Sequence, residues 1–213
     1  MSAARDDILN RVKKALAGGP PPNPRRLPPE PNRETRSREE LKREFSERWV
    51  NLGGRLRLAG SPRDLEEIIR EISREYPGPA AVATSALDVA PDLKGILEKL
   101  NLEVWSAHPD QARDAAFGLT GAFLAMAYSG SLAVRSDPPG ELSASLVPPV
   151  HAALVPVDRL IYGPTEAIRR LGASGWPRAA SFITGPSRTA DIELNLVMGV
   201  HGPGQTYAVL LDF

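Results

Sequence analysis

The chain has 213 residues, of which 42% are hydrophobic, so it can bury the core of one large domain or of one domain with an arm. Its 26 basic and 26 acidic residues balance, and the absence of a basic excess argues against nucleic acid as a partner. There is no cysteine, which excludes disulfides, thiolate nucleophiles and cysteine-held zinc or iron–sulfur sites.

The sequence carries no signal for a membrane or for export. Its longest apolar run, residues 122–128, is far shorter than the roughly 20 residues that span a bilayer. Asp6 and Asp7 stand where a signal peptide would be apolar. We therefore expect a cytoplasmic protein with no membrane span.

The N-terminal part predicts a helical arm on a tether. Residues 3–17 carry apolar side chains at helical spacing. Residues 18–34 are rich in proline, which lacks the amide donor and fixes φ, so they predict an extended linker. The expected organisation is an amphipathic helix at 1–17, this linker, and a domain at 35–213. The apolar stripe of the helix needs cover from its own domain, from a second copy or from another protein.

Residues 35–116 alternate between helical and strand patterns. The helix expected at 35–50 begins with the capping-box pair Ser37 and Glu40. Further helices are predicted at 62–76, 90–100 and 109–116, and strands at 56–59, 80–84 and 102–106. Alternation of this kind predicts an α/β fold in which helices cover both faces of a parallel sheet.

The second half begins with two apolar runs, 123–127 and 131–134, which predict either a hairpin or one long bulged strand. Beyond them the patterns predict strands at 152–156, 180–184 and 206–211, and helices at 165–171 and 189–198. No internal repeat interrupts this series.

The first candidate for chemistry is the expected strand–loop–helix at 181–193. A loop that leaves the carboxyl end of a parallel strand is a common ligand site. Gly185 allows close backbone approach, Ser187 can donate, and Arg188 can pair with a carboxylate or phosphate. Asp191 places negative charge in the first turn, so an ordinary capped helix is the alternative interpretation.

The second candidate is the bend at 128–131. Gly130 in an apolar region indicates a bulge or a close backbone approach, and Ser129 and Ser131 can donate to a ligand. A tight hairpin turn explains the same residues without a ligand. The pattern of a serine-hydrolase elbow is absent.

The histidines form the third candidate. Their spacing does not match a metal motif, so we predict neither a metal site nor a cofactor. His151 opens a strand, and His201 lies in the glycine-rich loop before the last strand. Either ring could move a proton near neutral pH, or it could simply hydrogen-bond a loop.

These segments resemble the LUD-domain family. The resemblance rests on Gly185-Pro-Ser-Arg-Thr-Ala-Asp-Ile-Glu193 and Gly199-Val-His-Gly-Pro203, with Leu146-Val-Pro-Pro-Val-His151 and Tyr128-Ser-Gly-Ser131 in the family's order. It covers about residues 40–213. It implies a three-layer α/β/α fold with a mostly parallel sheet, similar to the ribose-5-phosphate isomerase and CoA-transferase group, preceded here by the helical arm.

The resemblance also implies a function. The chain would be an accessory or regulatory subunit in L-lactate oxidation to pyruvate, acting with iron–sulfur protein partners. One departure from the family's pattern argues against a CoA-transferase activity. Tyr128 stands where the family usually has glutamate, and tyrosine cannot form the acyl intermediate that such a glutamate forms in CoA transferases.

Two other functions remain open from the residues alone. One is an enzyme acting on a carboxylate, sugar-phosphate or acyl-CoA substrate, and the other is a scaffold that binds protein through residues 3–17; a homo-oligomer is compatible with each. For a small anionic ligand, we expect one pocket at the carboxyl edge of the sheet. Its predicted residues are Ser129, Gly130, Ser131 and His151 from one side and Gly185, Ser187, Arg188, Asp191 and His201 from the other.

Overall fold

The computed structural model describes residues 3–17, 36–137, 140–190, 196–199 and 201–213. The chain divides into two compact units, Met1–Glu34 and Thr35–Phe213. The first contains helix α1 (Ala3–Leu16), with Asp6 in its first turn and lysines in its last turn, as the helix dipole favours. Its apolar side chains Ile8, Leu9 and Val12 are exposed.

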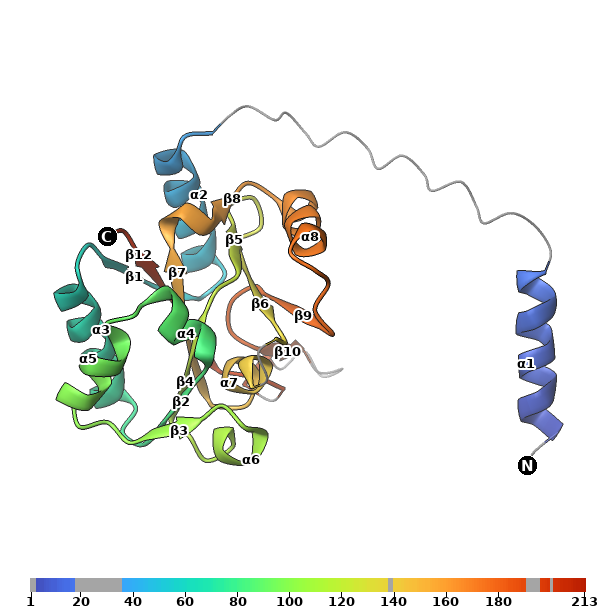
Figure 1. Ribbon diagram of the computed structural model, residues 1–213, viewed down its shortest axis with the longest axis horizontal. Helices are drawn as coiled ribbons and strands as arrows, with labels where there is room; N and C mark the ends of the chain where they lie inside the picture. The colour runs from blue at the N-terminus through green and yellow to red at the C-terminus, as the bar shows by residue number, and fades with distance from the viewer. Residues whose placement is uncertain (1–2, 18–35, 138–139, 191–195, 200) are drawn as a thin grey trace. The chain divides into compact units, whose positions relative to one another are not determined.

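The second unit is organised around a six-stranded sheet in which every neighbouring pair is parallel (Figure 1). In sheet order the strands are β1 (Arg55–Ala59), β12 (Gln205–Leu211), β7 (Val150–Pro156), β4 (Phe117–Gly121), β2 (Ala80–Val82) and β3 (Val104–Ser106). The central strands are buried on both faces, which explains their nearly continuous apolar sequences.

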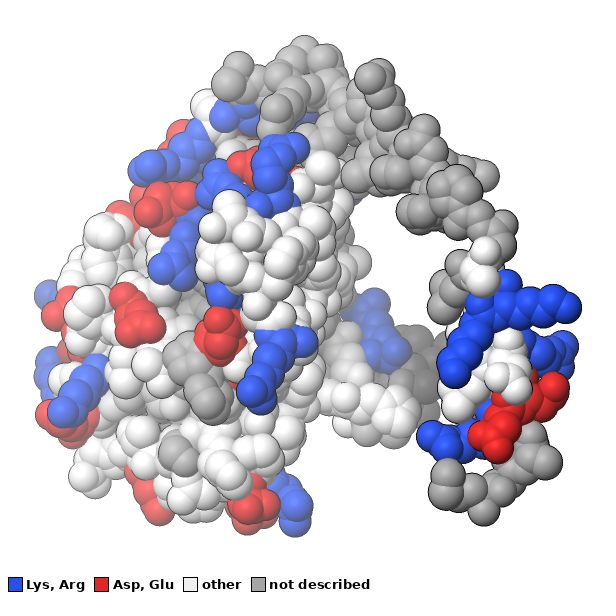
Figure 2. All heavy atoms as spheres, turned by 45° about the vertical axis from the view of Figure 1, so that its right-hand side comes forward, with Lys and Arg blue, Asp and Glu red and all other residues white. Residues whose placement is uncertain are grey.

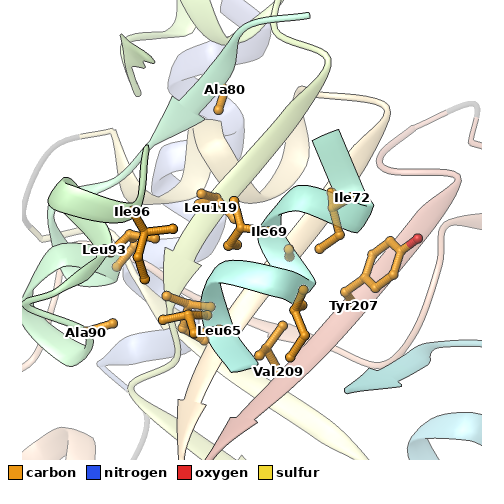
Figure 3. Packing of buried hydrophobic residues seen from close by; sticks show 14 of the residues in the cluster. Leu65, Ile69, Ile72, Ala80, Ala90, Leu93, Ile96, Leu119, Tyr207 and Val209 are labelled. Carbon is orange, nitrogen blue, oxygen red and sulfur yellow. The ribbon is translucent and has the colours of Figure 1, made fainter. Parts of the chain in front are cut away.

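Helices α3 (Pro62–Glu75), α4 (Thr84–Val89) and α5 (Leu93–Lys99) cover one face. Helix α3 starts at the N-cap Ser61, and Leu65, Ile69 and Ile72 recur along its inner face. Figure 3 shows these side chains packed with residues of α5 and of the sheet, among them Leu119 and Val209.

The opposite face carries a second, four-stranded sheet in the order β8-β5-β6-β9. Its members are β8 (Leu160–Ile161), β5 (Leu124–Met126), β6 (Ser131–Arg135) and β9 (Ala180–Ile183). Leu132 and Val134 of β6 pack against Ala153 and Val155 of β7, together with Phe45 of helix α2 (Arg38–Asn51). Helix α8 (Pro164–Ala173) covers the outer side of this second sheet (Figure 1).

Helices therefore flank a mostly parallel sheet, which confirms the three-layer α/β/α fold. The helix predicted at 62–76 and the capping box of α2 are confirmed. The apolar runs around Gly130 form an antiparallel hairpin, β5–β6. Strand β4 and helix α7 (Glu141–Leu146) were not predicted, and helix α6 (Pro109–Ala112) is shorter than expected.

The helix predicted at 189–198 is wrong. The chain instead forms strands β10 (Arg188–Ala190) and β11 (Leu196–Met198), which pair antiparallel with Arg188 opposite Met198. Their β-branched residues Thr189 and Val197 suit paired strands, and this pairing prevails over the local helical pattern. The residues between the two strands lie outside the described part of the chain.

Within the described ranges, no helix is long and apolar enough to cross a membrane. On the face that Figure 2 shows, basic and acidic side chains are interspersed rather than gathered into a single-sign surface. This distribution agrees with the balanced composition and offers no basic stripe for a nucleic acid on that face.

Candidate functional site

His151, the loop that contains His201 and the Gly-Pro-Ser turn lie at the amino edge of the sheet, not at its carboxyl edge. His151 is the second residue of β7, and the loop that contains His201 leads into β12. The Gly-Pro-Ser turn joins this edge, because the Ser187 amide donates to the Pro203 carbonyl at 2.8 Å. The expected edge was wrong because these segments precede parallel strands instead of following them.

Three of the predicted residues pack against the end of helix α2. Gly185 adopts φ +88°, and a Cβ there would lie 2.9 Å from the Leu52 carbonyl oxygen. Gly130, at φ +62°, meets Arg48 and Leu52 in the same way. Arg188 donates to the Leu52 carbonyl at 2.7 Å, so its guanidinium satisfies a helix-terminal acceptor. These residues have a structural role that accounts for their types.

Two of the predicted residues, Ser131 and His151, do not face one cavity. Ser131 bonds Thr184 through their hydroxyls at 2.8 Å. Its neighbour Leu132 packs toward β7, so alternation turns Ser131 to the outer side of the second sheet. His151 lies on the same face of β7 as Ala153, and this face packs against the inner side of the second sheet. Ser131 and His151 therefore do not point into one cavity, whereas a pocket formed by the other predicted residues stays a prediction.

Ser129 and His201 differ in their exposure to solvent. Ser129 is half-buried next to the hairpin turn, His201 is exposed, and Asp191 lies outside the described residues. Tyr128, where the family usually has glutamate, packs its ring against Tyr162 at 5.6 Å. Ligand binding by the nine sequence-predicted residues stays a prediction.

His151 is completely buried, and burial lowers its pKa from 6.5 to about 4. Its Nε2 lies 2.8 Å from the Thr120 hydroxyl. Its Nδ1, like the hydroxyl of its strand neighbour Thr206, has no hydrogen-bond partner among the described atoms. The ring is therefore neutral at physiological pH, with one N–H, and it does not gain a second proton in that range.

A different site lies at the carboxyl edge, where the strand order reverses. From β2 the chain moves outward to β3, returns to β4 and continues in the other direction through β7 and β12. The reversal leaves a crevice between the carboxyl ends of β2 and β4, the usual ligand site of open parallel sheets. The Gly121 amide at the end of β4 donates to the Ser85 hydroxyl at 2.7 Å, which joins the two segments.

A cavity of about 190 Å³ opens at this position, which we call the switch-point crevice. It is small beside the pockets that hold drug-sized ligands, at roughly 300–1,000 Å³. Polar and charged residues predominate among those that line it, which are Ser85, Asp88, Gly121, Phe123, Arg135, Asp137, Glu141 and Arg159. The crevice therefore suits a small polar molecule.

Glu141 is the most deeply buried acid of the crevice, at 1% exposure. One carboxylate oxygen accepts from the Ser85 amide at 2.9 Å, and the other accepts from the Ser85 hydroxyl. Burial raises the pKa of Glu141, and the hydrogen bonds from Ser85 oppose that rise. None of the ion pairs in the described chain includes Glu141. A buried acid without a cation is costly, and such groups concentrate at functional sites.

Two arginines face the same crevice. Arg135 is held by Asp137, whose carboxylate oxygens lie 3.1 and 2.7 Å away, and it stacks over the Phe123 ring at 4.9 Å. Arg159, in the short helix η1 (Val157–Arg159), donates one N–H to the Ala122 carbonyl at 2.8 Å. Arg159 forms no ion pair with any described residue, which leaves other guanidinium donors for a carboxylate.

Sequence reasoning missed Ser85, Glu141 and Arg159. They lie far apart in the chain and form no motif, and the helix that carries Glu141 was itself not predicted. Their sequence positions gave no signal, because only the strand order brings them together. Among the described residues, no cluster of histidine and acidic side chains is arranged to hold a metal ion.

The fold and the crevice define a three-layer α/β/α protein with a small polar site at the reversal of strand order. The model of the LUD domain matches residues 42–211, and the chain belongs to this family.

Relatives of known name match most of the chain. A lactate utilization protein C from Anoxybacillus flavithermus is 33% identical over 156 residues, which cover 70% of this chain and 71% of that protein. A lactate utilization protein C from Oceanobacillus iheyensis is 27% identical over 169 residues, with 71% and 72% covered. The crystal structure of a DUF162 family protein from Deinococcus radiodurans superposes with a TM-score of 0.61 at 19% identity and covers 83% of this chain and 99% of its own. The last comparison supports the fold.

Proposed function

We propose that this chain acts in lactate utilisation, as an accessory or regulatory subunit in the oxidation of L-lactate to pyruvate with iron–sulfur protein partners. The relatives named lactate utilization protein C support the pathway, since they match about 70% of the chain. The absence of cysteine supports an accessory role beside iron–sulfur partners, because cysteine-held clusters would have to reside in other subunits.

Within that role, the switch-point crevice binds a small monocarboxylate such as lactate or pyruvate. The observation that carries this proposal is the pairing, in one small cavity, of the free donors of Arg159 with the buried acid Glu141. Guanidinium groups recognise carboxylates through two parallel hydrogen bonds. The cavity volume favours a three-carbon acid over a sugar phosphate or a CoA ester.

Growth on L-lactate tests the role in the cell. Deletion of the gene should abolish or slow growth on L-lactate and leave growth on glucose unchanged. Complementation with Arg159→Gln should fail, whereas complementation with Arg169→Gln, an exposed arginine of α8, should restore growth. Normal growth of the deletion strain on L-lactate would overturn the proposed role.

A thermal-shift panel tests the ligand class. L-lactate and pyruvate should stabilise the protein, by roughly 2.7 kcal/mol at 100 times the dissociation constant. Ribose 5-phosphate and acetyl-CoA should have no effect. Stabilisation by either of these larger compounds alone would instead favour an enzyme acting on sugar phosphates or acyl-CoA.

Copurification tests the partners. A tagged chain isolated from cells grown on L-lactate should bring down proteins that show the visible absorption of iron–sulfur clusters. The same preparation from cells grown on glucose serves as the control. Recovery of the tagged chain alone from lactate-grown cells would contradict a stable complex.

A further inference from the structure

The acid in the crevice poses an electrostatic problem for an anionic ligand. Glu141 lies in the wall of the cavity with both oxygens bonded to Ser85. Asp88 of α4 and Asp137, just beyond β6, line the same cavity and add negative charge. An anion in the crevice would therefore face a buried carboxylate that has no cation of its own.

The arginines of the crevice cannot neutralise both the carboxylate of a ligand and the carboxylate of Glu141. Arg135 is committed to Asp137 at 2.7 Å. Arg159 is the guanidinium with donors left for an incoming carboxylate. On the other elements packed against α7, His151 of β7 is neutral, and His108 beside α6 is exposed and pairs with Asp110 at 3.5 Å. If Arg159 binds the ligand, Glu141 has no counter-charge.

We propose that the switch-point crevice binds a small monocarboxylate together with one proton, and that this proton resides on Glu141. The inference rests on the proposed ligand class and adds the protonation state in which the site works. The proton comes from solvent and forms the O–H bond of the Glu141 carboxyl group, with no other bond made or broken. The bound carboxylate and the neutral Glu141 together then carry one negative charge, which Arg159 can balance.

The hydrogen bonds around Glu141 accommodate the added proton. The Ser85 amide and hydroxyl each donate to one oxygen of the carboxyl group. The Ser85 hydroxyl donates its hydrogen to Glu141, while its oxygen accepts a hydrogen bond from the Gly121 amide. A protonated Glu141 keeps both of these bonds as an acceptor and gains an O–H donor for the carboxylate of the ligand.

Proton uptake makes the affinity depend on pH. Where free Glu141 is ionised, binding must add the proton, and the dissociation constant should rise about tenfold for each pH unit. Where free Glu141 is already protonated, the dissociation constant should be independent of pH. The ionised ligands lactate and pyruvate do not change charge in this range, so the dependence reports the protein.

Isothermal titration calorimetry of the full chain with L-lactate and with pyruvate measures the uptake directly. Titrations at pH 6, 7 and 8, each in two buffers of different ionisation enthalpy, count the protons taken up. We expect about one proton for each bound anion at pH 8. This measurement on the wild type needs no variant to fold.

Two variants locate the proton. Glu141→Gln retains the shape, and its single amide oxygen can still accept one of the two hydrogen bonds from Ser85. It should therefore bind the same anions without proton uptake and with a dissociation constant that does not change with pH. Glu67→Gln, an exposed acid of α3, should keep the uptake and pH dependence of the wild type. Circular dichroism melts verify that both variants are folded.

The outcomes separate this inference from the proposed function. Binding by the wild type at pH 8 with no proton uptake, or an undiminished uptake in Glu141→Gln, overturns the inference and leaves the ligand class intact. Absence of binding at every pH overturns the ligand class, and the inference with it. Uptake of one proton that disappears in Glu141→Gln supports both.

Discussion

His151 shows how burial alone fixes the state of a residue. Its ring lies among three parallel strands, next to Thr120 and Thr206, and no described charge offsets the loss of water. The sequence predicted that His151 opens a strand, and this is confirmed. Its burial depends on the β12 and β4 neighbours, which lie 55 and 33 residues away by number (Thr206 and Gly118). The sequence therefore left the protonation of His151 near neutral pH open, and its burial in the fold lowers the pKa to about 4.

The pH dependence of stability tests this residue. Because the folded-state pKa of about 4 lies below the ordinary 6.5, the unfolded chain binds the proton more tightly. Stability from His151 is complete above 6.5 and is lost as the pH falls toward 4, by about 3 kcal/mol in total. Urea unfolding of the wild type should show this loss relative to His151→Gln. An NMR signal of the His151 ring that titrates near 6.5 would contradict the account.

At the scale of elements, the sequence predicted the helices and strands with a strong hydrophobic periodicity and missed those with a weak one. Helix α3 has four inward apolar residues and a capped start, and its prediction is confirmed. Strand β4 has the sequence Phe-Gly-Leu-Thr-Gly, and its two glycines hid a central strand. Helix α7 is a short helix without an apolar stripe, so it was missed, and Glu141 was missed with it.

Helix α7 crosses β4 so closely at Gly118 that this position has no room for a side chain. A Cβ on Gly118 would lie 1.8 Å from the Ala144 carbonyl oxygen of α7. Gly118→Ala should therefore lower the free energy of unfolding by about 3 kcal/mol or more, since the backbone of α7 has to move. Gly95→Ala in α5 meets open space and should raise it by about 0.5–1 kcal/mol. Urea unfolding compares the two, and equal effects would contradict the packing of α7 on β4.

At the scale of the whole molecule, the sequence predicted a parallel sheet but not the order of its strands. Strand order decides which loops meet, and it depends on pairing between residues as distant as Arg55 and Tyr207. Without it, the loops that precede β7 and β12 were assigned to the wrong edge. The same missing order concealed the crevice between β2 and β4.

Removal of the first 34 residues tests the division of the chain. The core side chains of the second unit, including Phe45 and Trp49, all lie within Thr35–Phe213. A chain that begins at Thr35 should melt within about 4 °C of the full chain, a shift equivalent to about 1 kcal/mol at this size. A much larger drop would show that the N-terminal unit supports the fold of the second.

The central claim is that the working site is the switch-point crevice and not the loops at the amino edge. NMR titration of the ¹⁵N-labelled 23.0 kDa chain with pyruvate tests it directly, because each edge has its own reporter amides. We predict saturable shifts of the Ser85 and Gly121 amides, which are lost in Arg159→Gln. Shifts confined to the amides of Ser187 and Gly204, at the amino edge, would contradict the claim.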